Sequence, residues 1–144
     1  MHLARFVVLV VLLGCVSQLT PAAFDVSTAD GQAAHVEQVL ATFGMQVERK
    51  DTQSGILETA WESTGENSDG TIWAMRYIVT IAPGELSTRI GVAMDLRTCE
   101  AGLGVNPNTG RLDGTSCTRL PPGTTPVSYQ NRLDDFAIEL HAAL

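Results

Sequence analysis

Hydrophobic residues recur at helical spacing between residues 33 and 43, and this pattern predicts an amphipathic helix over roughly residues 30–43. Gly44 follows at the position where a helix favours glycine in a left-handed conformation. Directly after it, the spacing of apolar residues changes to two, which is typical of a half-buried strand. The apolar positions of the predicted helix are Ala33, Val36, Val39, Leu40 and Phe43.

Stretches of alternating apolar and polar residues predict four consecutive strands, over residues 45–50, 56–63, 71–82 and 85–98. Short polar turns join them, so we expect an antiparallel meander with one apolar face and one solvated face. The apolar face is expected to carry Leu57, Thr59, Trp61, Trp73, Met75, Tyr77, Val79, Ile81, Leu86, Ile90, Val92, Met94 and Leu96. The solvated face is expected to carry Glu48, Glu58, Glu62, Arg76, Arg89, Asp95 and Arg97.

The last nineteen residues predict a second amphipathic helix, in which Pro126 stops the preceding coil and Ser128 acts as the cap. Its apolar stripe consists of Tyr129, Leu133, Phe136, Ala137 and Leu140. Together these elements predict an α+β fold: a four-stranded antiparallel meander with two helices packed on one face, in the order α-β-β-β-β-α. Residues 30–144 are expected to form one domain.

The N-terminus has the form of a signal peptide, with Arg5 followed by an apolar run over residues 6–13. This run is too short to span a bilayer, which takes about 20 residues. The segment Leu12-Leu13-Gly14-Cys15 resembles the lipobox of bacterial lipoproteins. That resemblance implies cleavage before Cys15 and acylation of its thiol, with residues 1–14 as signal peptide and 15–29 as a lipidated tether. Val16, rather than Asp, follows the cysteine, which implies sorting to the outer membrane with the domain facing the periplasm.

Cleavage by the ordinary signal peptidase is the alternative, near Ser17 or at Ala22-Ala23. It would release a soluble periplasmic or secreted protein. The sequence leaves both cleavage sites open.

Cys99 and Cys117 remain once Cys15 is assigned to lipidation, and an even pair in an exported chain predicts one disulfide. The segment between them is rich in Gly, Asn and Asp and has almost nothing to bury. A bridge closing such a loop contributes about 3 kcal/mol in the chain-entropy model. The alternative is two free thiols in a metal or redox site, but the chain has no CxxC spacing.

The chain is acidic, with a formal net charge of −7 and a single lysine, Lys50. Removing residues 1–14 takes away Arg5 and no acidic residue, which leaves −8. Nucleic-acid affinity depends on neutralising phosphates with lysine and arginine. Nucleic acid is therefore excluded from the expected partners.

No residue pattern indicates catalysis or a cofactor. His35 and His141 are expected at the surface, and the adjacent Asp134 and Asp135 point in different directions on a helix, so they make no carboxylate dyad. A faint calcium-loop pattern consists of Asn106, Asn108, Gly110 and Asp113. It lacks the acidic first ligand and the bidentate Glu. The expectation is a protein that is not an enzyme and holds no metal.

Aromatic residues on the expected apolar face have two interpretations. Trp61, Trp73, Met75 and Tyr77 either pack against the two helices as core, or line a space for a lipid or other apolar ligand. The second interpretation requires the helices to stand off the sheet. The sequence leaves both open.

A family resemblance covers roughly residues 33–95, from AAHVEQVLATFGMQVERKDTQSGILETAWES to RYIVTIAPGELSTRIGVAM. This run resembles the domains of the BamC-type outer-membrane assembly lipoproteins. In both, a helix ends in Gly, a short strand leads to an Asp-and-Gly turn, and strands with aromatic residues follow. This chain has one such module, and its 99–117 loop is not part of that pattern.

The predicted function is a bacterial cell-envelope lipoprotein that serves as a non-catalytic binding or assembly module, with other envelope proteins as partners. The alternative is a periplasmic carrier or sensor of an apolar ligand. Two surfaces are candidates for partner binding. One is the loop with Leu103, Val105 and Leu112, and the other is the charged sheet face, represented by Arg76 and Arg89.

Overall fold

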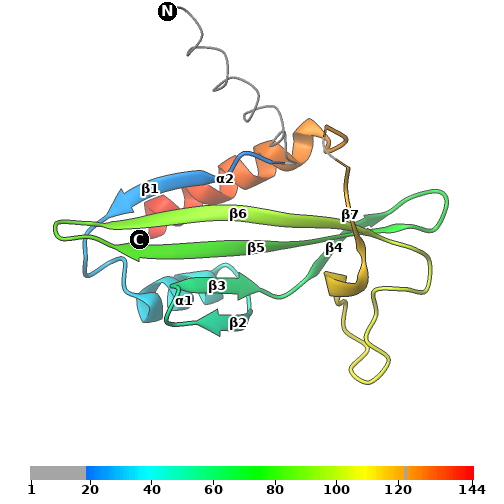
Figure 1. Ribbon diagram of the computed structural model, residues 1–144, viewed down its shortest axis with the longest axis horizontal. Coiled ribbons are helices and arrows are strands. Elements are labelled where there is room, and N and C mark those ends of the chain that lie inside the picture. Colours follow the sequence, from blue (N-terminus) through cyan, green and yellow to red (C-terminus); the bar gives the residue numbers. More distant parts are fainter. Residues whose placement is uncertain (1–18, 122) are drawn as a thin grey trace, which may run out of the picture.

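The computed structural model describes residues 19–121 and 123–144 and shows an α+β fold (Figure 1). This part of the chain forms one open antiparallel sheet of seven strands and two α-helices. The strands are β1 (Ala22–Val26), β2 (Val47–Asp51), β3 (Ile56–Thr59), β4 (Glu62–Glu66), β5 (Ile72–Pro83), β6 (Thr88–Cys99) and β7 (Thr118–Arg119). The helices are α1 (Ala33–Thr42) and α2 (Val127–Ala143), and a short 3₁₀-helix, η2, covers Gly114–Ser116.

The long hairpin of β5 and β6 is the spine of the sheet (Figure 1). Each strand has 12 residues, and they pair along their whole length, from Ile72 opposite Cys99 to Pro83 opposite Thr88. Shorter strands flank each half of the hairpin. At one end β1 pairs with β6 and β3 pairs with β5, which gives the order β1-β6-β5-β3-β2. At the other end, β4 pairs with β5 and β7 pairs with β6.

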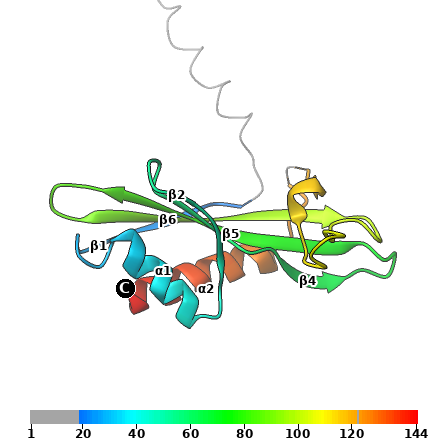
Figure 2. The same cartoon turned by 90° about the horizontal axis from the view of Figure 1, so that it is seen from below.

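Both helices pack on one face of the sheet, which Figure 2 shows edge-on. The predicted apolar face is confirmed for the paired parts of β5 and β6, whose residues form the main core together with the two helix stripes. The prediction is wrong for Leu86, which lies in the turn between the two strands and is 94% exposed. Its members from the long strands are Met75, Tyr77, Val79, Ile81, Ile90, Val92, Met94 and Leu96. The helices contribute the buried Val36, Val39, Leu40, Leu133, Phe136, Ala137 and Leu140.

The caps predicted for the ends of the two helices are confirmed only in part. Gly44 has the predicted left-handed backbone, with φ of 76°, and its N–H donates to the carbonyl of Ala41. The predicted cap of α2 is wrong: Pro126 is the N-cap residue, and Ser128 lies inside the first turn. Proline suits this boundary because its fixed φ and missing N–H cost nothing at a helix start.

The prediction of four strands is wrong, because seven lie in the part of the chain that the structure describes. The segment predicted as one strand over 56–63 is split into β3 and β4 by a break at Ala60 and Trp61. The Ala60 N–H donates to the carbonyl of Gln46, 2.7 Å away. On the other side, the Tyr77 N–H donates to the hydroxyl of Thr59. Glu58 and Glu62 lie four positions apart but their partners Ile78 and Met75 on β5 lie only three apart, and this register shift changes which residues face the helices.

Residues 19–29 are not a tether, as the sequence predicted, but belong to the folded domain. Ala22–Val26 forms β1 in the sheet, and Leu19 and Val26 lie in the main core. Thr20 is held by Gln130 of α2, whose amide both donates to its carbonyl and accepts from its N–H. The folded domain therefore includes residues from 19 onwards rather than from 30. The predicted signal peptide and Cys15 lie outside the described residues.

Candidate functional site

The loop between Cys99 and Cys117, which we call the disulfide loop, is closed by the predicted bond between these two residues. Cys99 ends β6 and is almost fully buried. Gly104 lies directly against the bridge, and a Cβ placed there would be 2.8 Å from Sγ of Cys99 and 3.0 Å from Sγ of Cys117. The loop thus returns over its own disulfide, and glycine is required at that contact.

Trp61 anchors the disulfide loop to the sheet. It forms a second buried cluster with Ala74 and Cys99, and Leu112 packs against that cluster. Gly114 of the loop lies so close that an added Cβ would be 2.5 Å from the indole ring. The expected place of Trp61 among the core aromatics is therefore wrong. The break at residues 60–61 turns its side chain to the face opposite the helices, where the loop covers it.

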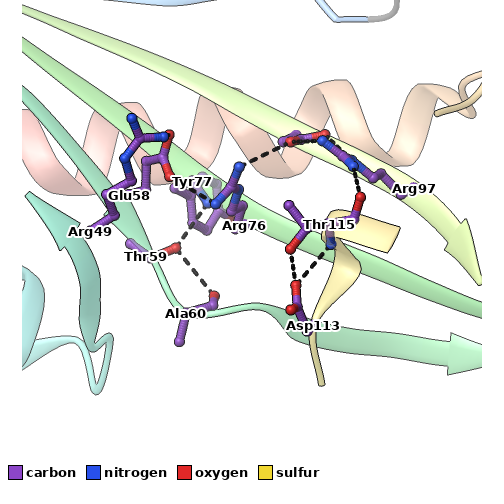
Figure 3. A network of polar contacts seen from close by, with 10 residues as sticks. Arg49, Glu58, Thr59, Ala60, Arg76, Tyr77, Arg97, Asp113 and Thr115 are labelled. Atoms are coloured by element: carbon purple, nitrogen blue, oxygen red, sulfur yellow. Dashed lines mark hydrogen bonds and ion pairs between the residues drawn. The ribbon is translucent and has the colours of Figure 1, made fainter. Parts of the chain in front are cut away.

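Four charged side chains form a buried network beside Trp61 (Figure 3). Arg76 donates from Nη1 to Glu58 over 2.8 Å and from Nη2 to Asp95 over 3.4 Å. Arg97 binds Asp95 through Nε and Nη2, at 3.1 and 3.0 Å. The side chains of these four residues are only 8–15% exposed. Each buried charge thus has an opposite charge within hydrogen-bonding distance, which offsets its desolvation.

The same two arginines hold the disulfide loop and Trp61. Arg97 donates from Nη1 to the carbonyl of Thr115 in the loop, over 2.7 Å. The guanidinium carbons of Arg76 and Arg97 lie 4.5 and 5.3 Å from the centre of the Trp61 ring, within the range of cation–π attraction. The network therefore fastens the disulfide loop to the face of the sheet that this loop covers.

The solvated character predicted for the charged face is wrong for these residues, because the disulfide loop covers them. The predicted place of Glu62 on the charged face is also wrong. It lines a cavity with Tyr77 and Arg132 on the helix side of the sheet rather than the charged side. The break at residues 60–61 causes this too, since it shifts the alternation of β4 relative to β3.

A cleft of about 460 Å³ lies between the charged sheet face and the disulfide loop. We call it the arginine cleft, because three of the chain's nine lysine and arginine residues line it: Arg49, Arg76 and Arg111. Its lining consists of Glu48, Arg49, Glu58, Trp61, Arg76, Asn106, Thr109, Arg111, Leu112, Asp113 and Thr115. Of the two surfaces that the sequence offered as alternatives, Leu112 of the loop and Arg76 of the sheet face thus meet in one cleft.

The mouth and the floor of the arginine cleft differ in exposure. The side chain of Arg49 is 70% exposed and lies 3.4 Å from Glu58, so it remains available at the mouth. Arg76 lies on the floor, where it is paired with two carboxylates. Arg49 is thus accessible from solvent, whereas Arg76 belongs to the buried network.

Asp113 organises the part of the disulfide loop that borders the arginine cleft. Its carboxylate accepts hydrogen bonds from the hydroxyl and the backbone N–H of Thr115 and so caps η2. These bonds, the hydroxyl contact first, lower the pKa of Asp113 below its usual range. Asn106 accepts from the N–H of Asn108. The side chains of the faint calcium pattern thus serve the loop itself, and the described residues contain no group of three or more metal-ligating side chains.

The remaining predicted partner-binding residues are dispersed. Leu103 and Val105 are exposed on the disulfide loop, by 57% and 48%, whereas Leu112 packs against the Trp61 cluster. The expectation that this loop has almost nothing to bury is therefore wrong for Leu112. Arg89 lies at the other end of β6 and pairs with Asp25 of β1 at 3.4 Å.

Aromatic residues on the helix side pack directly against α2. The rings of Tyr77 and Phe136 lie 3.9 Å apart, and those of Trp73 and Tyr129 are stacked at 5.3 Å. Of the two histidines expected at the surface, His141 stacks on Phe24 with ring centres 4.4 Å apart. The aromatic side chains are thus in contact with the helix that covers them.

No protein-family model matches the chain, and no curated protein matches it either. Within residues 19–121 and 123–144, neither helix combines the length and apolarity needed to cross a bilayer. The function is therefore inferred from the geometry of the cleft and the loop and from the amino-acid sequence.

Proposed function

We propose that the protein is a bacterial cell-envelope lipoprotein that acts as a non-catalytic binding or assembly module, with partners bound at the arginine cleft and the adjoining disulfide loop. The pathway we assign is outer-membrane assembly, and that assignment depends on the BamC-type resemblance alone. The proposed location is the periplasmic side of the outer membrane, through acylated Cys15.

One observation carries the binding role: exposed apolar side chains sit on a loop that is held rigid. Leu103 and Val105 are exposed by 57% and 48%, yet the loop that bears them is fixed by its disulfide and by Arg97. Large apolar side chains exposed on a rigid scaffold favour association, because little conformational freedom is lost on binding. The cations at the mouth of the arginine cleft adjoin this surface and would direct acidic groups of a partner.

The position of β1 supports cleavage upstream of it. Cleavage at Ala22-Ala23 would cut through β1 and remove Leu19 and Thr20, which contact the core and α2. Cleavage before Cys15 leaves all of these contacts intact. The carrier alternative gains no support from the structure, because Trp73 and Tyr77 are stacked on α2 residues.

Changing Cys15→Ala is expected to abolish acylation and release the protein from membranes into the soluble envelope fraction. The measurement is fractionation of cells followed by mass spectrometry of the N-terminus. Cys117→Ser provides a matched loss of a different cysteine and should leave the protein in the membrane fraction. A mature N-terminus of the unmodified chain that carries no acyl group on Cys15 would contradict the lipoprotein assignment.

Changing Leu103→Ser together with Val105→Ser is expected to reduce partner capture at least tenfold while leaving the fold intact. Both side chains point away from the core clusters, so little packing is lost. The measurement is quantitative pull-down by the tagged full chain from detergent-solubilised envelopes, with thermal unfolding as the check on folding. Leu86→Ser is the matched control, because Leu86 is 94% exposed at the tip of the β5–β6 hairpin, away from the cleft.

The same pull-down separates the two halves of the proposed site. Changing Arg49→Glu and Arg111→Glu reverses the charge at the mouth. Arg49 also pairs with Glu58 of the buried network at 3.4 Å, so thermal unfolding again checks that the fold is intact. Capture that survives the loop variant but fails with these reversals would move the site to the cations. Capture that survives both sets would contradict a binding role for this end of the molecule.

A further inference from the structure

The outer edges of the sheet are protected very unequally. β2, at one end of the strand order, has the sequence VERKD, with three consecutive exposed charged residues and a register shift against β3. β4 is also bulged, at Gly65, and carries two glutamates, while β7 has only two residues. Charges, bulges and short length are the devices that prevent unwanted strand pairing.

The edge of β1, which has five residues like β2 and β4, has fewer of these devices. Its sequence, AAFDV, contains no lysine or proline, and its pairing with β6 has an unbroken register over all five residues. Its one charge, Asp25, is paired with Arg89 of the neighbouring strand. Within the described residues, β1 pairs with β6 alone, and an edge without a second strand is a template for another one.

A groove of about 300 Å³ runs beside this edge, between β1 and α2. Ala22, Ala23 and Phe24 line one side, and α2 lines the other with a stripe that contains Ile138, which is 67% exposed. The stripe continues to Asp134, one turn before Ile138, and to His141, nearly one turn after it. Acidic, apolar and basic side chains thus follow one another along the outer side of the helix.

We infer that the β1 edge is the interface with a second copy of this chain, in which two β1 strands pair antiparallel about a twofold axis and join two sheets into one. Antiparallel pairing of identical strands is compatible with such an axis, so each copy presents the same surface to the other. This inference goes beyond the proposed function and does not depend on the lipid anchor or the arginine cleft.

The stripe on α2 favours a second copy over an unrelated strand, because it is complementary to itself. When two α2 helices run antiparallel about an axis near Ile138, the two Ile138 side chains meet at the centre. Asp134 of one copy then faces His141 of the other, and an imidazole N–H can donate to a carboxylate. Ala23 lines the same groove as Ile138, so one twofold axis can relate both the strand pair and the helix pair.

Cysteine cross-linking in the full chain tests this arrangement in isolated envelope membranes. Ala23→Cys and Ile138→Cys each place a thiol near the proposed axis, and a mild oxidant should convert most of each variant into a covalent dimer. Glu48→Cys is the matched control, because it places an exposed thiol on the protected edge strand β2. The unmodified chain shows whether its own cysteines contribute any cross-link.

The inference predicts dimers for both test variants and at most background for Glu48→Cys. Ala23→Lys, which puts a charge at the edge, should reduce cross-linking through Ile138→Cys at least tenfold while leaving the melting temperature of the domain nearly unchanged. The absence of dimers from both test variants would overturn the inference. If Glu48→Cys forms as much dimer as the test variants, the cross-links come from random collision and the inference is overturned. Adducts of a different mass would overturn it too, because they would show that another protein covers this edge.

Discussion

Changing Asp95→Ala is expected to lower the free energy of unfolding by about 3–5 kcal/mol, because it removes one side of a buried ion network. Asp95 accepts two hydrogen bonds from Arg97 and one from Arg76, and its side chain is 8% exposed. Without it, the Arg97 guanidinium remains buried with no carboxylate partner. Urea unfolding followed by tryptophan fluorescence measures the loss.

The chain provides a matched control for this experiment in Asp25. Its pairing with Arg89 at 3.4 Å also joins neighbouring strands, but these side chains are 55% and 61% exposed. Asp25→Ala should therefore cost no more than about 1 kcal/mol. Replacing Asp95 and Arg97 together by Leu and Met should recover much of the stability lost in Asp95→Ala, since no unpaired Arg97 charge then remains. Equal costs for Asp95→Ala and Asp25→Ala would contradict the buried network.

Removing the disulfide by changing Cys99→Ser and Cys117→Ser is expected to cost about 3 kcal/mol. For a domain of this size, that loss corresponds to a decrease in melting temperature of roughly 10 °C. The cover of Trp61 should loosen with the loop, so the fluorescence emission should shift to longer wavelength before global unfolding.

A reducing agent provides the control for the disulfide experiment. It should reproduce the decrease in the unmodified protein and have no further effect on the double variant. Alkylation of the untreated, denatured protein should label neither Cys99 nor Cys117. Labelling of both would contradict the bond.

The sequence predicts well the elements that have long, regular patterns. β5 and β6 alternate over 12 residues each, and both helices have clear apolar stripes, so their positions and buried faces agree with the structure. The pattern misses β1 because this strand has five residues, of which only Ala22, Phe24 and Val26 face inward, and nothing around it indicates a sheet. Short edge strands depend on a partner that is distant in sequence, here β6.

The sequence predicts which residues contribute to the candidate site but not how they are arranged. The sequence identifies Arg76, Arg97 and Glu58 on one face and a loop between two cysteines, but not that the loop covers that face. That arrangement depends on the break before Trp61, which turns the indole ring toward the loop, and on Gly114, which allows close approach to it. A break of two residues within an alternating stretch leaves no trace in the pattern, so the alternation places Trp61 on the wrong side.

The early start of the folded domain sets a limit on how far it can stand from a membrane. With acylation at Cys15, the chain has to reach Leu19 through residues 16–18, and these four steps span at most about 14 Å. A tether extending to residue 29 would have reached about 50 Å. The domain would then be confined to the layer next to the lipid headgroups. The disulfide loop would extend on the side of the sheet that lies opposite β1 (Figure 1). Its encounters would be limited to proteins that are embedded in that membrane or travel along its surface.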